Sequence, residues 1–120
     1  MDIFSMKLGK IYSLLVAKAG RKGRTKEEVN ALIFSLRGYD EASLEKAVSD
    51  DISYGEFFRN APSFDPGWVN VKGSICSVRI ENIGDELMRK VRVLDKLVDD
   101  LAKGKPLEKI LSFRTSNRAV

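Results

Sequence analysis

The chain has 120 residues and a net charge of +4, and 43% of its residues are hydrophobic and 32% charged. This length fits a single hydrophobic core, and this apolar content excludes a wholly disordered chain. The longest apolar stretch, residues 14–17, is far too short to cross a membrane, and residues 1–20 lack a signal-peptide core, so we expect a cytoplasmic protein with no membrane contact.

Charge is distributed unevenly along the chain. Residues 18–26 contain five cations and no acid, and residues 103–120 contain five cations and one acid. Because the whole chain carries +4, the residues outside these two segments together carry −5. The two basic segments are therefore the parts of the sequence that would attract an acidic partner.

Two helices are predicted in the first third of the chain. Apolar residues recur at spacings of three and four up to Gly20, which indicates one buried helix face. That face comprises Leu8, Ile11, Tyr12, Leu15 and Ala19. Thr25 and Glu28 form a capping box, so a second helix begins at about Lys26 and ends at Gly38. Its buried face comprises Val29, Leu32, Ile33 and Leu36.

Two shorter helices are predicted next. Asp40 is placed to cap the first of them, and a capping box of Ser53 and Glu56 begins the second, which Pro62 ends. The apolar residues of these two helices are Leu44, Ala47, Val48, Phe57 and Phe58.

A loop and a small amount of β structure follow. Residues 61–67 contain two prolines and a glycine, with a turn predicted at residues 65–67. Apolar residues at 68–71 and an alternating pattern over residues 75–80 predict two short strands around Gly73, as a hairpin or bulged ribbon. A lone hairpin is only marginally stable in water, so we expect this ribbon to pack against helices.

The strongest predicted element is a helix from Asp85 to Lys103. Its buried face comprises Leu87, Val91, Leu94, Val98 and Leu101, and is widened by Met88 and Leu97. Pro106 is expected at the first position of a last short helix. The sequence therefore predicts an α+β fold: a helix-rich single domain over residues 1–111 with a small two-stranded β ribbon, and a flexible polar tail over residues 112–120.

Several segments of the chain resemble a prokaryotic family catalogued only as domain-of-unknown-function family 2200. The resemblance covers residues 7–111 and departs from the family at Glu86, where relatives have proline, and over residues 64–71. It implies a small prokaryotic protein and supplies no activity, cofactor or catalytic residue. The matching segments are residues 9–12, 17–19, 21–29, 38–40, 94–99, 102–105 and 108–110.

The composition excludes several kinds of chemistry. The chain has no histidine, so neither a Ser-His-Asp nor a Cys-His nucleophilic site can form within it, and the usual zinc sites are disfavoured. The single cysteine, Cys76, cannot form an internal disulfide and is expected to be a buried apolar residue. No glycine-rich phosphate loop is present. We therefore expect no cofactor, no metal and no catalytic residue.

The basic segment is the one feature with a competing functional interpretation. Its cations are Lys18, Arg21, Lys22, Arg24 and Lys26. Lys18 and Arg21 lie at the negative end of the first helix, where cations are stabilising, but the helix dipole does not account for Arg24 and Lys26. The segment is either a solvated loop or a contact for an acidic protein surface or nucleic acid. Specific reading of DNA bases is disfavoured, since the second helix offers only Lys26, Asn30 and Arg37 for it.

Two classes of function remain open from the sequence. The leading hypothesis is a non-enzymatic binding or adaptor protein that uses its basic surface. The alternative is an enzyme with a carboxylate, lysine or tyrosine site near the loop from Phe64 to Trp68, because aromatic residues and a proline-rich loop are compatible with a ligand pocket. The tyrosines considered for that site are Tyr12, Tyr39 and Tyr54. The sequence does not distinguish a monomer from a homodimer.

Overall fold

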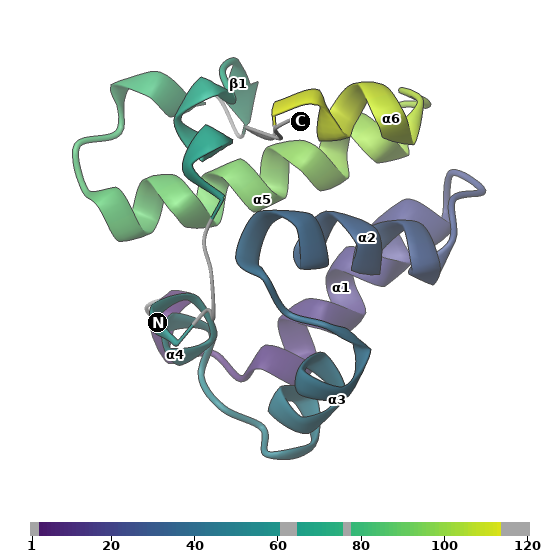
Figure 1. Cartoon of the computed structure of the whole chain (residues 1–120), viewed down its shortest axis with the longest axis vertical. Helices are drawn as coiled ribbons and strands as arrows, with labels where there is room; N and C mark the ends of the chain where they lie inside the picture. Colours follow the sequence, from purple (N-terminus) through teal and green to yellow (C-terminus); the bar gives the residue numbers. More distant parts are fainter. Residues whose placement is uncertain (1–2, 61–64, 76–77, 114–120) are drawn as a thin grey trace, which may run out of the picture.

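The computed structural model of the chain describes residues 3–60, 65–75 and 78–113. The helices are α1 (Leu8–Gly20), α2 (Lys26–Arg37), α3 (Glu41–Ser49), α4 (Tyr54–Arg59), α5 (Glu86–Ala102) and α6 (Leu107–Ile110) (Figure 1). Short 3-10 turns are η1 (Ile3–Ser5), η2 (Pro66–Asn70), η3 (Ile80–Asn82) and η4 (Leu111–Phe113). The strands are β1 (Ser74–Ile75) and β2 (Val78–Arg79). The α+β prediction is confirmed.

Helix α5 lies at the centre of the fold. It contacts α1, α2, α4 and α6 as well as β1 and η3, and from Leu87 to Ala102 none of its residues is exposed. The predicted face is buried at Val91, Leu94, Val98 and Leu101, while Leu87 is only half-buried. Burial of this whole helix is what holds the surrounding elements in one core.

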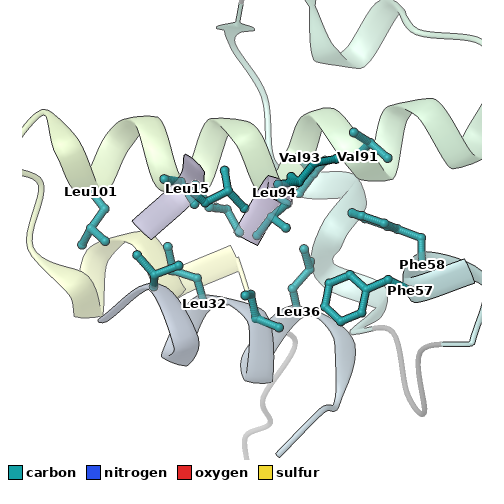
Figure 2. Packing of buried hydrophobic residues seen from close by; sticks show 14 of the residues in the cluster. Leu15, Leu32, Leu36, Phe57, Phe58, Val91, Val93, Leu94 and Leu101 are labelled. Carbon is teal, nitrogen blue, oxygen red and sulfur yellow. The ribbon is translucent and has the colours of Figure 1, made fainter. Parts of the chain in front are cut away.

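The core lies between α5 and the helices that cover it. Figure 2 shows Leu32 and Leu36 of α2 directed toward Leu94 and Leu101 of α5. The aromatic end of the same core comes from α4, whose Phe57 and Phe58 rings meet edge to face with their centroids 6.0 Å apart. These side chains are all at most 4% exposed, so the predicted faces of α2 and α4 are confirmed.

The predicted helix caps are present. Thr25 and Ser53 each accept a hydrogen bond from the backbone N–H three residues later, and both capping boxes are complete. Asp40 and Asp85 cap α3 and α5, and Gly38 ends α2 in the left-handed conformation with φ 76°. Each cap satisfies a backbone group that a helix end leaves unpaired, which is why these boundaries can be predicted from the sequence.

The position of the β structure differs from the prediction. The first strand was expected at residues 68–71, but that segment forms the 3-10 turn η2, in which Asp65 accepts a hydrogen bond from the N–H of Gly67. The antiparallel pair lies further along the chain, where Ser74 faces Arg79 and Ile75 faces Val78. An Asx turn at Asp65 starts a helical turn, and this local bonding outweighs the β propensity of the apolar residues after it.

The C-terminal end of the described chain is packed. Pro106 occupies the N-cap position of α6, one position before the first helical position at which it was predicted. Ile110 of this helix is buried. Phe113 in η4 is also buried and lies against η2, so packed structure continues two residues beyond the predicted boundary at Leu111. The rest of the predicted tail, together with Pro62 and Cys76, lies outside the described residues.

Candidate functional site

The α1–α2 turn brings the two basic parts of the chain together. This turn and the end of α5 lie at the same end of the molecule (Figure 1). Lys18 and Lys103 both pair with Asp99, at 3.1 and 2.9 Å, and Lys105 lies 3.7 Å from Asp100. Residues that are about eighty positions apart in the sequence thus share one surface.

Arg24 holds this arrangement together. Its guanidinium donates to the carbonyl oxygens of Leu101 and Lys105 at 3.1 and 3.0 Å, and so caps the C-terminal end of α5. The same group pairs with Glu28 at 2.6 Å. The hydrogen bond from Arg24 holds the pKa of Glu28 down to about 2. Arg24 therefore has a structural role within the fold. Its contact with a partner stays a prediction.

The remaining cations of the segment are exposed. Arg21, Lys22 and Lys26 make no ion pair or side-chain hydrogen bond within the described part of the chain. Arg21 and Lys22 belong to the turn that Arg24 joins to the end of α5, and Lys103 and Lys105 follow that end of α5. We call these four residues the basic corner. Lys26 instead lies at the start of α2, at the edge of a groove.

The groove lies between α1, α2 and α3 and has a volume of about 470 Å³. Its apolar lining comes from Phe34, Leu44 and Val48. At one end Tyr12 donates a hydrogen bond to Asn30 at 2.5 Å, and burial raises the pKa of Tyr12. The charged residues around the groove are Lys26, Glu27, Glu41 and Glu45. We call it the acidic groove.

The acidic groove was not anticipated from the sequence. Glu27 lies in the first turn of α2 and Glu41 in the first turn of α3, and an acid at either position is accounted for by the helix dipole alone. Glu41 and Glu45 are four residues apart and therefore share a face of α3, which was the available indication. What the sequence could not supply is the packing of α3 next to Phe34 and Tyr12.

The three tyrosines do not gather at the loop from Phe64 to Trp68. Tyr39 is buried, donates to the carbonyl oxygen of Phe57 at 2.8 Å and stacks on its ring. Tyr54 is fully buried, and this burial raises its pKa well above the ordinary value. Tyr12 lies at the acidic groove instead. Phe64 lies outside the described residues.

Arg37 also departs from its expected role. It was considered for contact with DNA bases, but its side chain is 0% exposed and lies between the rings of Phe57 and Phe58, 3.7 and 3.5 Å from their centroids. Burial lowers the pKa of Arg37 to about 9, so the guanidinium is still charged at neutral pH. Arg37 belongs to the core.

The described residues contain neither a metal-binding cluster nor a membrane-spanning helix. No group of three or more cysteine, aspartate or glutamate side chains is placed to hold a metal ion in the part of the chain that the structure describes. Among the same residues, no helix has the length and apolar character of a membrane span.

The fold and these surfaces define a small helix-rich α+β protein with a basic corner and an acidic groove. The chain belongs to the family described as an uncharacterized protein conserved in bacteria (DUF2200), whose model matches residues 2–112. The crystal structure of uncharacterized protein SP1917 is similar, with a TM-score of 0.90 and 40% identity over 98% of each chain. No curated protein matches the chain.

Proposed function

We propose that the protein is a non-enzymatic binding protein that contacts an acidic protein surface through the basic corner. The observation that carries this proposal is the state of Arg21 and Lys22, which are exposed and free of ion pairs within the described residues. Arg24 fixes the turn that bears them to the end of α5. The backbone that bears these cations is therefore already held in place before binding, which favours a contact role over a merely solvated loop.

The size of the corner favours an acidic protein over nucleic acid. Lys103 and Lys105 are partly neutralised by Asp99 and Asp100, so only a few charges are available. Nucleic-acid-binding proteins draw most of their affinity from phosphate contacts, often about 6–10 of them, and the four cations of the corner are fewer than that. The acidic residues beside the corner would also repel a continuous phosphate backbone.

The alternative of an enzyme site near Trp68 has less support. Tyr39 and Tyr54 serve the core, and the acidic groove lies along α1, α2 and α3. No observation favours a catalytic arrangement at that loop.

Binding of an acidic polymer tests the proposal. The double variant Arg21→Glu/Lys22→Glu should lose affinity for poly-glutamate by roughly tenfold or more at low salt, since each reversal replaces an attraction with a repulsion. Fluorescence anisotropy of labelled poly-glutamate measures this, and a labelled DNA duplex run in parallel tests the nucleic-acid interpretation.

The matched control carries the same change of charge elsewhere. Lys10→Glu/Lys72→Glu alters two exposed lysines away from the corner and should keep most of the affinity. Equal losses in the two double variants, or no binding of poly-glutamate by the parent chain at low salt, would contradict the proposal. Tighter binding of DNA than of poly-glutamate would replace the acidic protein with nucleic acid as the partner.

A further inference from the structure

The acidic groove combines features that a merely solvated surface does not need. Glu27, Glu41 and Glu45 make no ion pair or side-chain hydrogen bond within the described residues, although every acid of α5 is paired. Glu27 and Glu41 lie in the first turns of α2 and α3, where the helix dipole stabilises them. Glu45 lies beyond the first turn of α3, so the helix dipole does not stabilise it in the same way.

The floor of the groove is apolar. Phe34 and Val48 are half-buried and Leu44 is 3% exposed, so part of this surface contacts solvent in a recess. The core side of α2 is formed by other residues, which pack toward α5 (Figure 2). The surface of Phe34 in the groove is therefore not required for the packing of α2 on the central helix.

The shape of the groove is elongated. Along α2 its lining extends from Lys26 to Phe34, and along α3 from Glu41 to Ser49. Eight residue steps of a helix span roughly 12 Å, which equals about two turns of another helix. A helix of that length presents apolar side chains at positions i, i+3 or i+4, and i+7 to such a groove.

We propose that the acidic groove is a docking site for a basic amphipathic helix of a partner protein. The apolar face of that helix covers Phe34, Leu44 and Val48, and lysine or arginine side chains beside that face pair with Glu27, Glu41 and Glu45. With three carboxylates and Lys26 the groove carries −2 in a chain of net charge +4. This sign is opposite to that of the basic corner, so the two surfaces select different partners.

A synthetic probe tests the proposal directly. The probe is a peptide of leucine and lysine about 14 residues long, since shorter isolated helices are marginal in water, with leucines at helical spacing. A peptide of the same composition in scrambled order has no apolar face. Titrated into the full chain at low salt, the amphipathic peptide should shift the backbone amide NMR signals of α2 and α3 but not those of η2 and η3.

Charge variants locate the site. Glu45→Lys should weaken binding of the amphipathic peptide by roughly three- to tenfold, because it turns one attraction into a repulsion at the rim of the groove. Glu108→Lys makes the same change at an exposed residue of α6 that forms no ion pair with the described residues, and this variant should bind as the parent does. Phe34→Ala should weaken binding even in moderate salt, since it removes apolar contact surface.

Several outcomes would overturn the docking of a helix. The first two are equal binding of the scrambled and amphipathic peptides, and equal affinity of the Glu45→Lys and parent chains for the amphipathic peptide. A third is no binding at about millimolar peptide. A fourth is equally tight binding of spermine, which would show that a cation alone suffices. Arg21→Glu/Lys22→Glu should not weaken binding of the peptide. The docking proposal and the proposed role of the basic corner can therefore fail independently.

Discussion

At the scale of single residues, Arg37 has the least expected environment. Its three guanidinium nitrogens have no hydrogen-bond partner among the described residues, although the side chain is 0% exposed. The guanidinium carbon lies over two phenylalanine rings, and each desolvated contact of this kind contributes about 2 kcal/mol or more. Desolvation of an unpaired buried charge costs several kcal/mol, so the charge is a net burden on the folded state.

Replacement of Arg37 by an apolar side chain of similar length should therefore stabilise the fold. We expect Arg37→Met to raise the free energy of unfolding by about 1–4 kcal/mol, because methionine removes the desolvated charge and still fills the space between the rings. Urea denaturation measures this. Arg37→Ala is the control, and it should lower the free energy of unfolding because it leaves a cavity. A methionine variant as unstable as the alanine variant would show that the stacked cation stabilises the core.

The packing around Gly67 leaves no room for a side chain. A Cβ atom built on this residue would overlap with the carbonyl oxygen of Phe113, which is where η4 packs on η2. We expect Gly67→Ala to lower the free energy of unfolding by roughly 1–3 kcal/mol, since the backbone must move to relieve the overlap.

The comparison for this variant is Gly84→Ala. A Cβ atom at Gly84 has no atom of the described residues within 4 Å, so the substitution should change the midpoint of thermal unfolding very little. Thermal unfolding followed by circular dichroism measures both variants. Equal midpoints for the two variants would show that η4 does not depend on close approach to Gly67.

At the scale of elements, the helices could be predicted from the sequence and the β structure could not be placed. The capping boxes at Thr25 and Ser53 act within four residues, and the buried face of α5 repeats over four turns, so local pattern and structure agree. Residues 68–71 have β propensity but follow Asp65, whose side chain begins a 3-10 turn. The secondary structure of short apolar runs of this kind is determined by the residues around them.

The candidate sites were harder to predict for the same reason. Arg24 becomes a cap of α5 only when a helix end 77 residues away is placed beside it. Arg37 ends an amphipathic helix, and a cation is favourable there because it lies near the negative end of the helix dipole. The residues next to it in the sequence do not indicate that phenylalanines from α4 enclose its side chain. Contacts between distant elements decide the role of each residue, and spacing along the chain does not encode them.

The pair of Glu28 with Arg24, supported by the capping box of α2, also gives the fold a defined response to acid. The pKa of Glu28 is about 2 in the folded chain, against an ordinary value of 4.5. The unfolded chain therefore takes up a proton first as the pH falls, and the free energy of unfolding should decrease between about pH 4.5 and pH 2. Glu28→Gln removes this contribution, so its stability should vary less with pH in that window.

Urea denaturation at a series of pH values measures this dependence. Glu108→Gln is the control, because Glu108 is exposed and its variant should follow the profile of the parent chain. If Glu28→Gln showed the same slope as the parent between pH 4.5 and pH 2, the pair with Arg24 would not be the source of the acid response.

At the scale of the whole molecule, the chain separates its charges onto surfaces of opposite sign. Ion pairs along α5 neutralise most of the central helix, whereas the basic corner and the acidic groove keep charges that no described residue neutralises. Both surfaces border α2, near its start. Together, the two proposed roles would bring partners of opposite charge to one protein, as an adaptor does.

The contacts of Arg24 with the end of α5 have a kinetic consequence. The side chain joins positions 77 and 81 residues apart, so the α1–α2 turn cannot move away from the central helix without breaking these bonds. Loops usually open far more often than the helices they connect. We therefore expect the turn to open together with the last turn of α5, and amide protons of the turn to exchange with solvent no faster than those of that helix end.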